Sequence, residues 1–167
     1  MFKLQKLSIL IISFLVLTGC DVLYTSNKQL KTYTHKSEKV LLICDDLYGE
    51  LEVITNIIQS KVSCTLYSIG DYQKPDMNQY DIILIGTTPI EDEPSVEMID
   101  FLNQMSLKNQ KVSTYWIGAM NNQIYESHIK QYIKSNNILP GLGFNNDEIS
   151  EKELITYFIY EWLLMIY

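Results

Sequence analysis

The sequence contains no arginine, and its 13 lysines are outnumbered by 20 acidic residues, which gives a formal net charge of −7 over 167 residues. Proteins that bind nucleic acid displace counterions from phosphates with a basic patch, so this composition excludes a nucleic acid partner. The chain also has only two histidines, His35 and His128, which are isolated from each other. A zinc site needs more ligands than these two supply.

Cysteine, proline and repeats are also scarce. The chain has three cysteines and four prolines, no internal repeat and no low-complexity stretch. Cys44 and Cys64 lie inside apolar runs, where a cysteine is usually a small buried hydrophobe. A disulfide between them is the alternative if the compartment is oxidising. With 47% apolar residues, the chain suits one globular domain with a substantial core.

The first twenty residues resemble a bacterial lipoprotein signal. Lys3 and Lys6 precede an apolar segment, residues 7–16, that is too short to span a bilayer comfortably. The tetrapeptide "LTGC" that ends at Cys20 is similar to the lipobox, which implies cleavage before Cys20 and attachment of diacylglycerol and palmitate there. The alternatives are an uncleaved anchor and an ordinary cleaved signal. In each case the domain lies outside the cytoplasm.

The chain therefore divides into three predicted parts. Residues 1–19 form the signal peptide, residues 20–37 a polar tether rich in Thr, Ser and Lys, and residues 38–167 the folded domain. Loss of Lys3 and Lys6 with the signal lowers the net charge from −7 to −9. We expect a lipid-anchored, extracytoplasmic protein whose membrane contact is the lipid on Cys20.

Strand and helix patterns alternate through the domain. Helical spacing of apolar residues predicts helices over 51–60, 96–105 and about 123–135, and a final helix capped by Ser150 and Glu153. Pro94 is expected in the first turn of the second helix. Runs rich in β-branched or aromatic residues predict strands at 39–44, 62–69, 80–86, 111–118 and 137–144.

This alternation predicts an α/β fold with an open five-stranded parallel sheet and helices on both faces. Continuous apolar runs such as "IILIG" agree, because central parallel strands are buried on both sides. Ligands of such sheets bind outside the carboxyl ends of the strands. The candidate site therefore lies in the loops 45–50, 86–94 and 118–124.

Asp45 and Asp46, at the end of the first strand, resemble the acids that bind magnesium in response-regulator receivers. In that family the third strand ends in the aspartate that accepts phosphate, and the fifth supplies a lysine. Here "YDIILIG" ends in Gly86 and "NILPGLGF" has no lysine. The sequence therefore does not support receiver activity.

Two longer stretches resemble flavodoxin. The stretch "YDIILIGTTPIEDEPSVEMIDFLNQMSLKNQKVSTYWIG" is similar to the flavodoxin segment with a strand, a Gly-x-Pro-Ile-type loop, a helix, a short connector and the next strand. "ILPGLGFNNDEISEKELITYFIYEWL" resembles the end of small flavodoxin-like proteins. The resemblance implies strand order 2-1-3-4-5 and an FMN site. It places that site at Asp46, Tyr48, Gly49, Thr87, Thr88, Pro89, Gly118 and Asn121.

The first loop departs from the flavodoxin pattern. Flavodoxins hold the FMN phosphate with hydroxyls and backbone N–H groups, whereas "DLYGEL" keeps the glycine and at most the Tyr48 hydroxyl. Acidic side chains here would repel a phosphate dianion. Asp45, Asp46 and Glu50, with residues 91–93 across the cleft, are instead hard oxygen ligands suited to a divalent cation such as Ca²⁺ or Mg²⁺. A solvated acidic surface is the simpler interpretation.

Two functions remain open. The first is a binding or assembly module that has lost FMN phosphate binding and recognises a cation or a basic partner. The alternative is an FMN electron carrier tethered at the membrane, with Tyr115 and Trp116 either stacked on the flavin or packed in the core. No Ser or Cys nucleophile lies near a histidine in these loops, so a hydrolase is not indicated, and we do not expect an enzyme unless it is redox-active.

Overall fold

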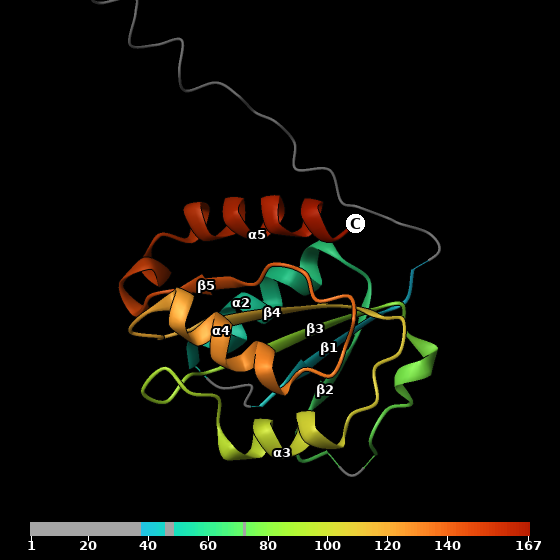
Figure 1. Ribbon diagram of the computed structural model, residues 1–167. Helices are drawn as coiled ribbons and strands as arrows, with labels where there is room; N and C mark the ends of the chain where they lie inside the picture. The colour runs from blue at the N-terminus through green and yellow to red at the C-terminus, as the bar shows by residue number, and fades with distance from the viewer. Residues whose placement is uncertain (1–37, 46–48, 72) are drawn as a thin grey trace, which may run out of the picture. The chain divides into compact units, whose positions relative to one another are not determined.

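The computed structural model describes residues 38–45, 49–71 and 73–167. Cys20, the signal peptide, the tether, Asp46 and Tyr48 lie outside these residues. The described chain forms a five-stranded sheet in the order β2-β1-β3-β4-β5, with every neighbouring pair parallel (Figure 1). The predicted fold class and strand order are therefore confirmed.

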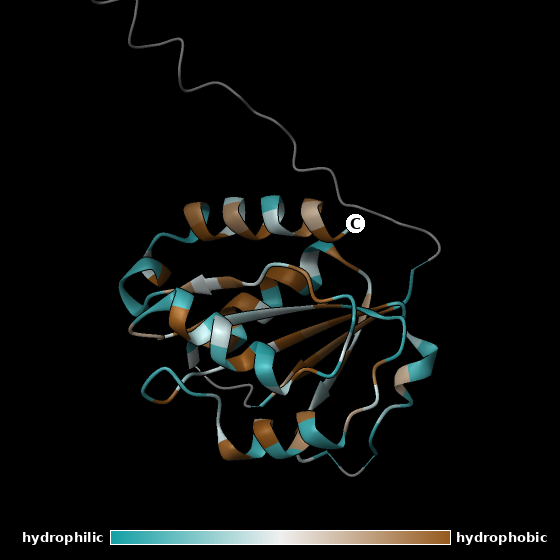
Figure 2. Cartoon of the chain, viewed as in Figure 1, coloured by the Kyte–Doolittle hydropathy of each residue, from teal (hydrophilic) through white to brown (hydrophobic). Residues whose placement is uncertain are grey.

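The two central strands are buried along their whole length. Every residue of β1 (Val40–Cys44) and β3 (Ile82–Thr87) is buried, and Figure 2 shows both strands in the hydrophobic colour over most of their length. The flanking strands are β4 (Lys111–Ile117) and the two edge strands, β2 (Cys64–Ser68) and β5 (Leu142–Phe144). Burial on both faces explains why the central strands read as continuous apolar runs.

Helices cover both faces of the sheet (Figure 1). On one face, α2 (Gly49–Lys61) and α5 (Lys152–Ile166) share an apolar cluster with β1, β3 and β4. On the other, α3 (Val96–Gln104) and α4 (Asn122–Tyr132) pack around Trp116 and Ile83. Two 3₁₀ turns complete the described chain, η1 (Met77–Gln79) and η2 (Asn146–Ser150). None of the helices in this part of the chain is both long and apolar enough to span a bilayer.

Several predicted boundaries differ from the structure. Pro94 precedes α3 rather than opening it, because Ser95 is the N-cap and its hydroxyl accepts a hydrogen bond from Met98 N at 3.1 Å. The predicted capping box at Ser150 is wrong. Ser150 ends η2, where its hydroxyl donates to the carbonyl of Asp147, and α5 begins at Lys152.

The fifth strand is shorter than predicted because proline interrupts it. The segment before Pro140 pairs only with Val112, which donates to Asn137 O and accepts from Leu139 N. Pro140 has no N–H to continue this pairing. The regular strand resumes at Leu142, and Trp116 pairs there with Gly143.

A small polar network lies inside the core, around Cys44 at the end of β1. The Tyr115 hydroxyl lies 2.9 Å from Thr55 Oγ1 and 3.1 Å from Cys44 Sγ, and Thr55 donates to Leu51 O. Burial raises the pKa of Tyr115 well above its usual value, so the phenol stays neutral and can bond its neighbours. Cys44 and Cys64 are both free thiols; Cys44 is buried, as expected from its apolar run, whereas Cys64 is only partly buried.

Gly86 is needed next to this network. A Cβ at position 86 would collide with the ring and hydroxyl of Tyr115. We expect Gly86→Ala to lower the free energy of unfolding by about 1–3 kcal/mol through overpacking, measured by urea denaturation. The same substitution made with Tyr115→Leu should cost less, because the clashing ring is gone. An equal cost in both backgrounds would contradict this explanation.

Candidate functional site

The carboxyl ends of the strands border a pocket of about 220 Å³. Because all five strands are parallel, the loops that follow them meet at one edge of the sheet, which we call the carboxyl edge. The first turn of α2, the loop after β3, the end of β4 and the start of η2 all contribute to the pocket. Its lining residues are Glu50, Leu51, Thr88, Pro89, Ile117, Gly118 and Asn146.

The first turn of α2 brings carboxylates to the end of the helix that attracts anions. Gly49 opens the helix with φ +64°, a left-handed conformation that favours glycine. Glu50 and Glu52 follow in the first turn, and Glu50 lines the pocket. These acids interact favourably with the positive end of the helix dipole, which a bound phosphate would otherwise use.

Asp45 ties the first loop to the second. Its Oδ2 accepts hydrogen bonds from Thr87 Oγ1 at 2.6 Å, from Thr88 N at 3.3 Å and from Ser95 Oγ at 3.4 Å. The hydroxyl of buried Tyr125 in turn donates to Thr87 Oγ1 at 3.2 Å. Asp45 therefore joins β1 to the β3–α3 loop and, through Thr87, to α4. These bonds give Asp45 and Thr87 structural roles.

The second loop closes with a tight turn. Ile90 and Glu93 exchange two backbone hydrogen bonds of 2.9 Å, and both central residues have positive φ, Glu91 at 50° and Asp92 at 62°. Positive φ at both central positions is the pattern of a type I′ turn. Asp92 accepts a hydrogen bond from Asn121 N at 3.0 Å, so this turn is tied to the third loop.

The acids of this turn face α4 more than the pocket. The Nδ1 of His128 lies 2.8 Å from Glu93 Oε1 and 3.1 Å from the carbonyl of Asp92. Neither acid is among the pocket's lining residues. The expectation that residues 91–93 would complete a cation site across the cleft is therefore not supported for Asp92 and Glu93.

The third loop uses its polar side chains to start α4. Asn121 is the N-cap, and its Oδ1 accepts from Gln123 N and Ile124 N. Gly118 has φ +93°, and a Cβ there would lie 3.0 Å from Asn146 Oδ1. Tyr115 and Trp116 are both buried, and Trp116 donates to Asn122 Oδ1 at 2.8 Å. Core packing is therefore their confirmed role.

The predicted site residues divide into three groups. Thr88, Pro89, Gly118 and Glu50 line the pocket, and Gly49 lies beside it at the start of α2. Asp45, Thr87 and Asn121 are engaged in bonds that hold the loops. Asp46 and Tyr48 lie outside the described residues.

Sequence reasoning missed Asn146, because it considered three loops at this edge and not the loop after the fifth strand. It also missed Leu51 and Ile117, apolar residues of α2 and β4 that the pattern assigns to the core. In the described ranges, no group of three or more His, Cys, Asp or Glu side chains is placed to hold a metal ion.

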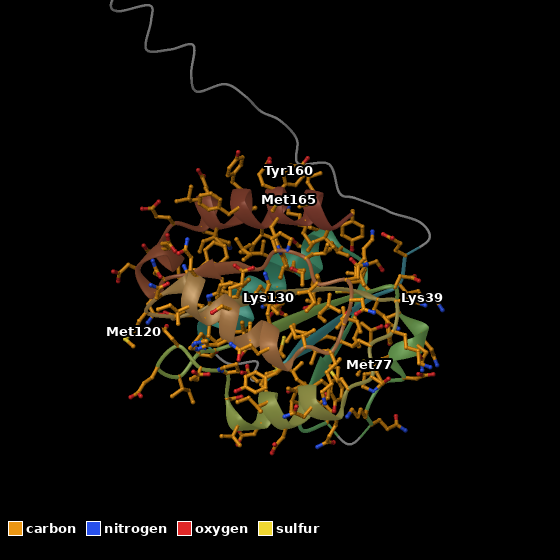
Figure 3. All side chains as sticks on the ribbon, in the orientation of Figure 1. Lys39, Met77, Met120, Lys130, Tyr160 and Met165 are labelled. Atoms are coloured by element: carbon orange, nitrogen blue, oxygen red, sulfur yellow. The ribbon has the colours of Figure 1, made fainter. Side chains whose placement is uncertain are left out.

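Charge is divided between the two ends of the sheet. The acids near the carboxyl edge are Asp45, Glu50, Glu52, Asp71, Glu91, Asp92, Glu93, Asp147 and Glu148, in the segments that follow β1, β2, β3 and β5. The amino ends of the strands carry Lys39, Lys61, Lys108 and Lys111, together with Glu38 and Asp81. Figure 3 shows Met120, in the third loop, and Lys39 at opposite ends of the molecule. The pocket therefore opens on an acidic surface.

Solved structures with the same fold are flavoproteins and flavodoxins. A flavoprotein from Lactobacillus acidophilus, solved in complex with FMN, is 18% identical and aligns over 70% of this chain and 99% of its own, with a TM-score of 0.55. Flavodoxin 2 from Bacillus cereus is 17% identical over 74% of this chain and 98% of its own, at 0.52.

A protein from Bacteroides eggerthii aligns over 77% of this chain and 98% of its own, with 16% identity and a TM-score of 0.60. The fold is therefore flavodoxin-like. No protein-family model matches the chain, and no curated protein matches it.

The bonds of Asp45 lead to a first test of the site. We expect Asp45→Ala to lower the free energy of unfolding by roughly 2–3 kcal/mol, because hydrogen bonds to a charged acceptor are stronger than average. Amide exchange at Thr88 should become faster in the same variant. Glu97→Gln, which removes an exposed carboxylate from α3, is the control and should change little. Unchanged exchange at Thr88 would show that Asp45 does not hold this loop.

Proposed function

We propose that this chain is a flavodoxin-like binding module, held at the outer surface of a bacterial membrane by lipid on Cys20, whose carboxyl edge no longer retains the phosphate of FMN. The observation that carries the proposal is Glu50 in the pocket, at the first turn of α2. Membrane attachment rests on the lipobox-like "LTGC" at residues 17–20.

Simple magnitudes support the loss of phosphate binding. A favourable helix N-terminus contributes about 0.3–2 kcal/mol to an anion. Two like charges about 4 Å apart repel by about 1 kcal/mol in water and about 4 kcal/mol near a protein surface. A phosphate at this turn would meet Glu50, with Glu52 in the same turn. The repulsion therefore outweighs the attraction of the helix.

The pocket also suits FMN poorly. Its volume of about 220 Å³ lies below the ~300–1,000 Å³ of typical cofactor sites. None of the lining residues in the described part of the chain is aromatic, so a flavin ring would find no stacking partner among them. Tyr115 and Trp116, which the sequence offered as stacking partners, are buried in the core.

The same edge offers a surface for a basic protein partner. The tied loops expose Ile90 and Met120, at 65% and 78%, among the acids of the carboxyl edge. Apolar side chains within an acidic surface match a partner with a basic rim and an apolar centre. We favour such a partner over a divalent cation, because the Asp45 carboxylate already accepts bonds from Thr87, Thr88 and Ser95.

The second candidate is an FMN electron carrier at the membrane. It is favoured by the fold shared with a flavoprotein solved with FMN, and by a pocket at the edge where open parallel sheets bind ligands. Backbone N–H groups of the first loop would then have to outweigh the acids. A shared fold does not by itself transfer this function.

Titration with two flavins separates these candidates. We expect FMN to leave the spectrum of the full chain unchanged up to about millimolar concentration, which corresponds to a binding free energy weaker than about −4 kcal/mol. Glu50→Gln with Glu52→Gln should tighten FMN binding about tenfold or more, because it removes roughly 1.4 kcal/mol or more of repulsion. Binding of riboflavin, which lacks the phosphate, should change much less in the same variant.

Glu153→Gln, in the first turn of α5, is the matched control for loss of a carboxylate at a helix N-terminus. Micromolar binding of FMN to the unmodified chain would instead establish the electron-carrier candidate.

A further inference from the structure

The outward side of α5 carries large apolar side chains, with Glu161 among them. The helix buries one face in the core, through Ile155, Ile159, Trp162 and other residues. The opposite side also carries large apolar side chains, spaced three, four or seven residues apart, and Figure 3 shows Met165 and Tyr160 on the outer side of the helix. The exposed members, which we call the α5 stripe, are Leu154, Tyr157, Phe158, Leu164 and Met165.

The exposed apolar side chains of the α5 stripe are concentrated on one helix and are not scattered singly over the surface. Ten large apolar residues are exposed in the described chain, and half of them belong to this one helix. The rings of Tyr157 and Phe158 lie 5.7 Å apart, and Met165 is 61% exposed. A contiguous exposed apolar patch usually marks an interaction surface. None of its members is among the lining residues of the pocket at the carboxyl edge.

The described chain begins beside the end of α5. Glu38 Oε1 pairs with Lys111 Nζ at 3.1 Å, and the same Nζ donates to the carbonyl of Ile166 at 3.2 Å. The segment that leads from Cys20 therefore enters the domain next to the C-terminal end of the stripe. Figure 1 shows the start of β1, in blue, and the C-terminus of α5 on the same side of the molecule.

We infer that the α5 stripe lies on the lipid bilayer to which the chain is tethered. This inference rests on the lipid anchor at Cys20 in the proposed function. Seventeen residues separate Cys20 from Glu38, and a random coil of that length would have an end-to-end distance of about 25 Å. Such a tether keeps the domain at a high effective concentration near the bilayer. The five apolar side chains of the α5 stripe therefore need only a modest affinity for lipid to stay in contact with it.

Side-chain chemistry and charge support this orientation. Tyrosine at the edge of an apolar helix face favours the boundary between headgroups and acyl chains. The lysines at the amino ends of the strands, Lys39 and Lys61, lie at the end where the chain enters, beside the C-terminal end of the stripe. Anionic headgroups would attract this end more than the N-terminal end of α5, where Glu151 and Glu153 follow the acidic carboxyl edge. Glu161 lies within the stripe and can remain hydrated at headgroup depth.

Brominated lipids test the contact directly. The full chain, expressed in a bacterial host, is reconstituted into vesicles of phosphatidylcholine and phosphatidylglycerol with or without bromine on the acyl chains. Both native tryptophans, Trp116 and Trp162, are buried, so a tryptophan added at the surface reports its own surroundings. The test variant is Phe158→Trp, and the matched control is Met120→Trp, at an exposed position of the third loop.

We expect brominated lipid to lower the fluorescence of the tryptophan added in Phe158→Trp about twofold. An interfacial helix buries its apolar face ~5–10 Å deep, which is within reach of the brominated carbons. Met120→Trp should show no such loss. Equal quenching of the two variants, or none in Phe158→Trp while the protein floats with the vesicles, would overturn the inference and leave the anchor intact.

Failure of the anchor has a different signature. If mass spectrometry of the full chain finds no diacylglycerol on Cys20, the lipid attachment itself is wrong. A second copy of the chain is the competing occupant of the stripe. Dimeric mass by light scattering in the Cys20→Ser protein, lost in Phe158→Glu, would assign the stripe to that copy and overturn the bilayer contact.

Discussion

The carboxylate of Asp45 is the contact on which the carboxyl edge depends. It stands where β1 leaves the sheet and accepts hydrogen bonds from the side chain of Thr87, the backbone of Thr88 and the N-cap of α3, Ser95. Thr87 extends the connection to Tyr125 on α4. A second bond, from Asn121 N to Asp92, joins the remaining loop. Three loops that are distant in the sequence thus form one bonded unit, and the pocket takes its shape from that unit rather than from any single loop.

The sheet could be predicted from the sequence because its signals are local and redundant. Runs such as "VLLIC" and "IILIGT" are continuous because both faces of β1 and β3 are buried, and this pattern survives errors of one or two residues at the ends. The end of the chain shows the limit of such reasoning. Ser150 and Glu153 have the spacing of a capping box, yet the hydroxyl of Ser150 bonds the carbonyl of Asp147 within η2. Local spacing alone cannot show which of two turns will use a side chain.

The site was harder to predict because acids have two opposite uses in it. Asp45 and Glu50 both belong to an acidic loop that suggests a cation site, but the structure makes Asp45 an internal acceptor and leaves Glu50 on the pocket. Tertiary partners such as Thr87 and Ser95, more than forty residues away, decide between these uses and have no signature in the loop itself. Asn146 was missed for a similar reason, since only the parallel topology places the residue after β5 beside Gly118.

The turn between Ile90 and Glu93 places acidic side chains at two positions where the backbone has a positive φ. Left-handed positions in such turns are usually filled by glycine, asparagine or aspartate, and other side chains are strained there. Asp92 therefore suits its position, and its carboxylate also accepts a hydrogen bond from Asn121 N. Glu91 is exposed to solvent and has φ 50°, a conformation that glycine would adopt with less strain. The acidic side chain of Glu91 is thus kept at the surface although it destabilises the backbone of the turn. At this position the charge of the surface, and not the stability of the fold, accounts for the identity of the residue.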